Sequence, residues 1–150
     1  EWSLADTPVS TPLSVTETSG QVSANDLAVL VSINDNAERG FASSRPDLPP
    51  FRSIVHIHGP DKRAVHIASS GEAVFVANRI IEAIKTARDR TRYSGKTHLF
   101  LCGPAGLGFL LGQLCNQCMP LQTYEFAPEA QGGRYTSAAV IRRHASVSPL

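Results

Sequence analysis

A Gly-Pro turn at residues 103–106 is the feature of this sequence best suited to hold a charged ligand. It interrupts the nearly uncharged stretch THLFLCGPAGLGFLLGQLCNQCMPLQTYEF, residues 97–126, where a strand-like apolar run gives way to a glycine-rich one of helical length. A helix N-terminus presents unpaired backbone N–H groups and about half a positive charge, so it can bind a phosphate without a basic side chain. The candidate anion site consists of Gly103, Pro104, Ala105 and Gly106. Alternatively, the glycines at 106, 108 and 112 only let the helix pack tightly on its sheet.

Polar residues at other predicted strand ends and helix starts could join this site. Each also has an ordinary structural explanation: turn formation for the asparagines, solvation for a loop arginine, helix capping for the two serines and exposure to water for the glutamate. As ligand contacts, they would hydrogen-bond a base or pair with a phosphate. These residues are Ser32, Asn34, Asn36, Arg39, Ser69, Ser70 and Glu125.

Other chemistry is poorly supported by the sequence. The histidines at 56, 58, 66 and 98 lack further ligands at zinc-like spacing, so we predict no metal site. The motif Cys115-x-x-Cys118 closes a predicted helix instead of opening one, which favours core cysteines over a redox pair. We find no nucleophile–base pair and no paired carboxylates of the catalytic kind. We therefore predict a binding module without a cofactor, not an enzyme.

Hydrophobic periodicity indicates the elements that must position the site. Alternating strands and helices predict an α/β, Rossmann-like fold, with a mostly parallel sheet and helices on both faces. In such folds ligands bind outside the carboxyl ends of the strands, where the Gly-Pro turn would lie. The long connection at 34–52 is a candidate ligand-covering loop. The predicted strands are 26–33, 53–58, 63–67, 97–102, 121–126 and an antiparallel edge strand at 134–141. The predicted helices are 70–90 and 104–117, and a capping box at Ser69 and Glu72 marks the start of the first.

Composition bounds the class of protein. The 150 residues are 42% hydrophobic, enough for one domain, which we place at 26–150 after a linker or truncated end at 1–25 rich in Ser, Thr and Pro. A net charge of +1 gives no strong field, so direct binding of duplex nucleic acid is not expected. Three cysteines, an odd number in apolar segments, indicate reduced thiols and a cytoplasmic protein. No membrane-length apolar run or signal segment is evident.

Two family resemblances centre on the Gly-Pro turn. The segment LFLCGPAGL resembles the Cys-Gly-Pro turn in the nicotinamide-dinucleotide-binding domain of ferredoxin–NADP reductase relatives, an oxidoreductase family. However, the loop NDNAERG after the first predicted strand lacks the glycine-rich turn that such domains use for pyrophosphate. The reductase function is therefore the alternative interpretation.

The longer stretch HLFLCGPAGLGFLLGQLCNQCMPLQTYEF resembles the C-terminal half of a SAVED domain. SAVED domains are similar to paired CRISPR-associated Rossmann-fold (CARF) modules and sense cyclic oligonucleotides in bacterial anti-phage CBASS systems. The resemblance spans about residues 26–141. It implies a cyclic oligonucleotide ligand and a linked effector such as a nuclease, a protease or a TIR-type enzyme. Because a full SAVED domain has two such halves, it also implies a second half, in the same chain or by self-association.

Overall fold

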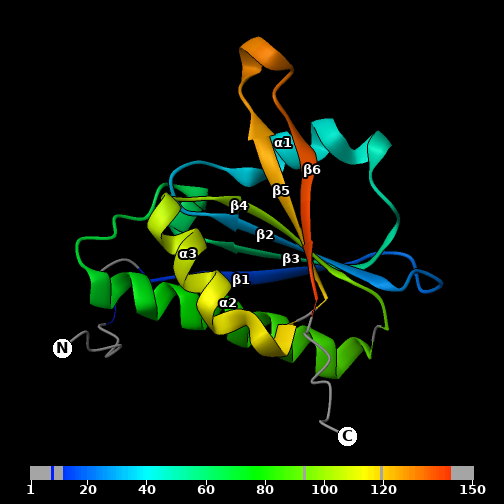
Figure 1. Ribbon diagram of the computed structural model, residues 1–150, viewed down its shortest axis with the longest axis horizontal. Helices are drawn as coiled ribbons and strands as arrows, with labels where there is room; N and C mark the ends of the chain where they lie inside the picture. The colour runs from blue at the N-terminus through cyan, green and yellow to red at the C-terminus, as the bar shows by residue number, and fades with distance from the viewer. Residues whose placement is uncertain (1–7, 9–11, 93, 119, 143–150) are drawn as a thin grey trace, which may run out of the picture.

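A six-stranded mixed sheet forms the centre of the protein (Figure 1). The computed structural model describes residues 8, 12–92, 94–118 and 120–142. The strand order is β1-β3-β2-β4-β5-β6. The four inner strands run parallel, and the two edge strands pair antiparallel with their neighbours. The strands are β1 (Ser14–Ser19), β2 (Asp26–Ser32), β3 (Phe51–His58), β4 (Thr97–Cys102), β5 (Leu121–Ala127) and β6 (Arg134–Ile141).

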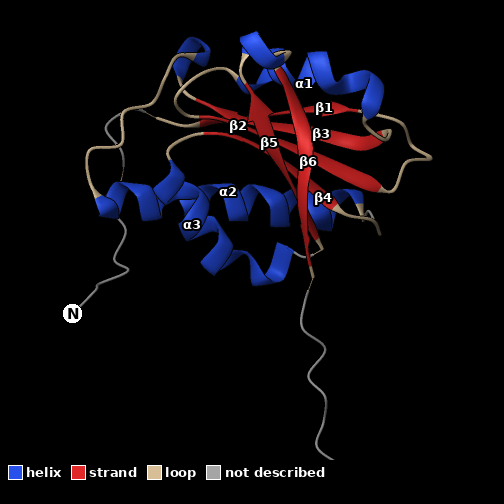
Figure 2. Ribbon diagram, turned by 45° about the horizontal axis from the view of Figure 1, so that its top comes forward, coloured by secondary structure: helices blue, strands red, loops and turns tan. Residues whose placement is uncertain are grey.

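Three α-helices cover the two faces of the sheet (Figure 2). The helices α2 (Ser70–Thr91) and α3 (Ala105–Leu114) lie on one face, and α1 (Ala37–Ser44) lies on the other. A hydrophobic core lies under each face, and β2, whose side chains are almost all buried, contributes to both. The α/β fold with helices on both faces is thus confirmed.

The capping box predicted for the long helix is present. The Ser69 hydroxyl accepts a hydrogen bond from the Glu72 backbone N–H at 3.2 Å, and the Glu72 carboxylate accepts one from the Ala68 N–H. These contacts satisfy N–H groups that a helix N-terminus leaves without an internal partner. The helix therefore begins at Ser70, as predicted, and it ends at Thr91.

Several elements differ from the sequence-based expectation. The sheet is less parallel than predicted, because β1 forms a second antiparallel edge within the segment 1–25 that we interpreted as a linker. The connection 34–52, expected to be a loop, contains α1. Residues 63–67 form no strand, since the Val65 N–H donates to the Ile33 carbonyl instead of pairing with β3. Residues 1–7, 9–11 and 143–150 of the predicted linker and domain lie outside the described residues.

The described part of the chain contains no helix long and apolar enough to cross a membrane.

Candidate functional site

The carboxyl ends of β2, β3 and β4 meet at one edge of the sheet, and a helix follows each of them. Backbone hydrogen bonds hold the three connections together. The Ile33 and Asn34 N–H groups donate to the Cys102 carbonyl at 2.8 and 3.0 Å, and the Val65 N–H donates to the Ile33 carbonyl at 2.8 Å. Helix N-termini therefore gather where ligands of α/β proteins bind.

A groove of about 810 Å³ lies between the N-terminal parts of α2 and α3. It brings together four residues predicted from the sequence: Ser69 and Ser70 on one side, and Pro104 and Gly106 on the other. None of its described lining residues is charged, and most are apolar. The other lining residues are Ile67, Ala73, Val74, Leu107, Phe109, Leu110 and Gln113.

The N-terminus of α3 differs from that of α2 because no side chain caps it. Its N-cap residue is Pro104, whose side chain makes no capping hydrogen bond, and its first turn carries no acidic residue. The exposed Ala105 is the first helical residue. The positive end of the helix dipole thus lies at the groove, which Pro104 and Gly106 line, without a counter-charge from α3 itself.

The two glycines of the turn have different surroundings. A Cβ atom at Gly103 would lie 3.3 Å from the side chains of Leu101 and Leu107, a close contact that those side chains would have to relieve by moving slightly. A Cβ atom at Gly106 would meet nothing within 4 Å. Neighbouring side chains thus restrict the space beside Gly103, whereas none of the described residues restricts it beside Gly106, so close packing does not explain the glycine at 106.

Two further predicted residues hold α1 in place instead of facing the groove. The Ser32 hydroxyl accepts a hydrogen bond from the Ala37 N–H at 2.8 Å and is buried, and the Asn36 side chain accepts one from the Glu38 N–H at 2.9 Å. Through these two hydrogen bonds, Ser32 and Asn36 satisfy backbone N–H groups at the N-terminus of α1. Asn34 is exposed at the edge of the sheet, beside the connections described above.

A polar cluster that the sequence analysis missed adjoins Ser32. His56, buried at the end of β3, has its Nε2 atom 2.7 Å from the Ser32 hydroxyl and its Nδ1 atom 3.2 Å from a Glu38 carboxylate oxygen. The second contact has an ion-pair distance but lacks hydrogen-bond geometry. Lys62 Nζ lies 2.9 Å from both Glu38 oxygens. The sequence signal was the His-x-His pair at the end of a strand, which we considered only as a metal motif.

Electrostatics in this cluster follow from burial and pairing. Burial lowers the pKa of His56 below its usual value, against the attraction of Glu38. The hydrogen bond from Lys62 lowers the pKa of Glu38. The order serine–histidine–carboxylate is that of a nucleophilic triad. However, Ser32 is 1% exposed and its hydroxyl already accepts a hydrogen bond from α1, so a substrate could not reach it in this conformation.

Arg39 and Glu125 are not part of the groove. Arg39 lines a separate pocket of about 430 Å³ between α1 and the β5–β6 hairpin, where it pairs with Glu129 at 3.1 Å. Both side chains of that pair are well exposed. Glu125 is exposed on β5 opposite Thr136, which matches the interpretation that it points to water.

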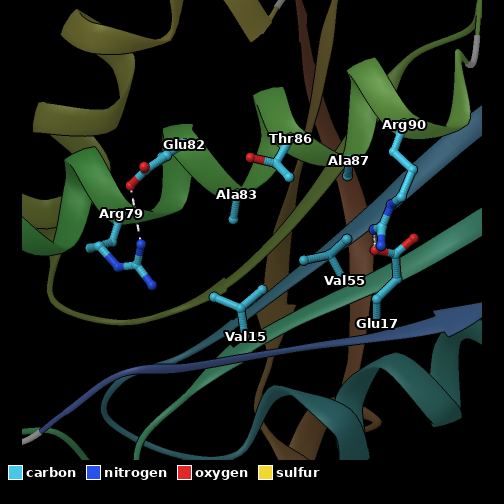
Figure 3. A pocket seen from close by; sticks show the side chains of 9 residues that line it. All are labelled: Val15, Glu17, Val55, Arg79, Glu82, Ala83, Thr86, Ala87 and Arg90. Atoms are coloured by element: carbon cyan, nitrogen blue, oxygen red, sulfur yellow. Dashed lines mark hydrogen bonds and ion pairs between the residues drawn. The ribbon is translucent and has the colours of Figure 1, made fainter.

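A third pocket, between β1 and the second half of α2, is a poor phosphate site (Figure 3). Its volume is about 210 Å³. Both arginines that line it are paired with carboxylates: Arg79 with Glu82, and Arg90 with Glu17. Figure 3 shows the Arg90 and Glu17 side chains pointing toward each other across the pocket. The positive charges there are already neutralised within the chain.

Cys115 and Cys118 are buried in a 3-10 turn after α3, and burial raises the pKa of Cys118 to about 11. They are core cysteines, as the sequence indicated. Within residues 8, 12–92, 94–118 and 120–142, no group of three or more His, Cys, Asp or Glu residues could hold a metal ion.

Comparison with known proteins assigns a family. The model of the SAVED family, the "SMODS-associated and fused to various effectors sensor domain", matches residues 1–141. The chain belongs to the SAVED family. This assignment confirms the resemblance to the SAVED family seen in the sequence and decides against the reductase alternative. A comparison with curated proteins finds no match.

Solved structures with the same SAVED fold include the Cap4 SAVED/CARF-domain containing receptor of Acinetobacter baumannii. The structure of that receptor with the cyclic trinucleotide 3'3'3'-cAAA matches with a TM-score of 0.72 and 14% identity, over 91% of this chain and 29% of that chain. Its complex with 2'3'3'-cAAA also gives a TM-score of 0.72, with 15% identity over 91% and 28% of the two chains. The present SAVED chain therefore spans less than a third of the Cap4 receptor.

Proposed function

We propose that this SAVED chain is a sensor module that binds a cyclic oligonucleotide second messenger and activates a linked effector in anti-phage CBASS defence. Family membership and the groove at the uncapped N-terminus of α3 support the proposal. The cyclic trinucleotides bound by the Cap4 receptor make a cyclic trinucleotide the first ligand to test. The module would act in the cytoplasm, where its three free thiols stay reduced.

The chemistry of the groove suits both parts of a nucleotide. A phosphate would accept hydrogen bonds from the Ala105 and Gly106 N–H groups, and Gly106 leaves room for its close approach. A base would lie against the apolar walls, where the Phe109 side chain is 67% exposed. Stacking of a base on an aromatic ring contributes about 1–3 kcal/mol. The Ser69 and Ser70 hydroxyls add hydrogen-bonding groups at the opposite wall.

The ligand would bind across two such modules, because a SAVED domain pairs two halves and we interpret this chain as one. The second half would come from the same protein or from another copy of this chain. If self-association supplies it, sedimentation velocity will show a ligand-dependent dimer. A chain that stays monomeric at saturating ligand and still binds tightly would refute pairing.

Calorimetric titration tests the proposed function directly. The titrants are cyclic di-, tri- and tetra-adenylates, with the linear triadenylate as a matched control that has the same bases but no ring, and NADPH. We expect binding of at least one cyclic compound, weaker binding of the linear one and none of NADPH. Binding of NADPH with no binding of any cyclic oligonucleotide would refute the sensor function.

A further inference from the structure

Lys62 occupies an unusual position at the ligand-binding edge of the sheet. It follows β3 in the 3-10 turn η2 (Pro60–Lys62), where Asp61 and Lys62 both have positive φ angles, 51° and 57°. Such angles are unfavourable for residues other than glycine and persist where the surrounding structure enforces them, often at functional sites. Here the turn places the Lys62 ammonium group 2.9 Å from both oxygens of Glu38.

The Lys62 side chain links solvent to a buried titratable group. It is 47% exposed and Glu38 is 40% exposed, whereas the His56 side chain is 6% exposed. Of these three residues, Glu38 is the one in contact with both others. Its carboxylate pairs with the Lys62 ammonium group and lies 3.2 Å from His56 Nδ1. Moving or removing the Lys62 ammonium group therefore changes the electrostatic potential at the buried His56 imidazole.

We propose that Lys62 is an anion-contacting residue of the sensor and that its transfer from Glu38 to a ligand phosphate makes His56 take up a proton. The inference rests on the proposed function, because the phosphate is that of the cyclic oligonucleotide. An ammonium group forms charge-assisted hydrogen bonds with phosphate oxygens just as it does with carboxylate oxygens. Lys62 reaches solvent at the edge of the sheet where the three connections meet.

The sign of the coupling follows from the charges around His56. Glu38 of α1 favours the protonated imidazole, whereas Lys62 of η2 and His58 of β3 oppose it, as does burial. From β2 the neighbour is the neutral Ser32 hydroxyl. When Lys62 turns toward a phosphate, the Glu38 carboxylate loses its strongest partner and keeps the Asn36 amide and His56, so its negative charge favours the protonated imidazole more strongly. The proton comes from solvent, so binding consumes protons from the buffer.

The relay can be tested without a ligand by following the His56 ring resonances through a pH titration. The substitution Lys62→Met removes the ammonium group and keeps most of the side-chain length, so we expect the pKa of His56 to rise. Glu38→Gln should lower it. Arg63→Met is the matched control, because Arg63 is the next cation along the chain and is exposed, with an ordinary φ of −77°. If Lys62→Met changes the His56 titration no more than Arg63→Met does, the relay is refuted.

The ligand step is tested by calorimetry with cyclic triadenylate in two buffers of different ionisation enthalpy near pH 7. Proton uptake makes the measured enthalpies differ. We expect uptake by the wild type, its loss in Glu38→Gln and about tenfold weaker binding by Lys62→Met. Binding without proton uptake overturns the inference and leaves the proposed function intact. If cyclic triadenylate does not bind, the same measurement is made with the cyclic oligonucleotide that does. If no cyclic oligonucleotide binds, the proposed function and this step are refuted together, while the pH titration of the variants still decides the relay.

Discussion

Replacing Gly106 with glutamate should strengthen the fold of the SAVED chain while weakening its ligand binding. Gly106 is the second residue of α3, and a Cβ atom added there would have no neighbouring atom within 4 Å. Replacing a helical glycine removes up to about 1 kcal/mol of helix penalty. An acidic residue in a first turn that now has none adds about 0.3–1 kcal/mol. We therefore expect the free energy of unfolding to rise by about 0.5–1.5 kcal/mol.

The same carboxylate would stand beside the site that we assign to a phosphate. Two like unit charges about 6 Å apart repel by about 0.7 kcal/mol in water and by about 2.8 kcal/mol at an effective dielectric constant of about 20. A groove open to solvent lies between these limits. The expected loss is about 1.4 kcal/mol or more, which is at least tenfold in the dissociation constant.

Gly106→Gln separates charge from size. Glutamine has nearly the same shape and helix propensity as glutamate, so it should also stabilise the fold, by a smaller amount, and reduce affinity less. The assays are urea denaturation for stability and calorimetric titration with the cyclic oligonucleotide for binding. Equal losses of affinity in the two variants would show a steric effect only. Unchanged affinity in a well-folded Gly106→Glu chain would place the phosphates elsewhere and refute our assignment of the α3 N-terminus.

Three further predictions concern the scaffold. Burial lowers the pKa of His56 and His98 below 6.5, so the unfolded chain binds more protons than the folded chain as the pH falls through that value. The free energy of unfolding should therefore decrease from pH 7.5 to pH 5.5, and equal urea midpoints at the two pH values would contradict this. Ser44→Ala should cost about 1–3 kcal/mol because it leaves a buried N–H of β6 without its acceptor, whereas the exposed Ser43→Ala should change the urea midpoint little. Phe100→Ala should cost about 3–5 kcal/mol because the ring is fully buried, and a loss below about 1 kcal/mol in urea denaturation would show that the cavity collapses.

The elements that carry strong local signals could be predicted from the sequence. The buried strand β2 is a continuous apolar run, and α2 has both helical periodicity and a capping box at Ser69. Once these elements are placed, the shared carboxyl edge of parallel strands brings Ser69 and Ser70 toward Pro104 and Gly106. This part of the groove follows from topology alone.

The edge strand and the short helix could not be predicted in the same way. All six residues of β1 are exposed, so the strand shows no buried apolar face, and its Ser- and Thr-rich sequence looks like a linker. Its position depends on backbone pairing with β3 and on the pair that Glu17 forms with Arg90 of α2. The buried positions of α1 follow the helical period, but Phe41 is the one large apolar residue among Ala37, Gly40, Phe41 and Ser44, so the hydrophobic pattern is weak. Its start does carry a signal, since Asn36 is a favourable N-cap. We interpreted that asparagine as a ligand contact, although the helix uses its side chain.

Glycines 103 and 106 show why residue type alone does not define a binding site. Both stand in the same turn, and both are candidate ligand contacts by sequence. The structure separates them only because the side chains of Leu101 and Leu107 fill the space beside the first and leave the space beside the second open. A glycine that the fold does not need, at an uncapped helix N-terminus in a groove, has lost its structural explanation. Contact with a ligand is the role that we propose for this position, which is why Gly106 is the residue to substitute first.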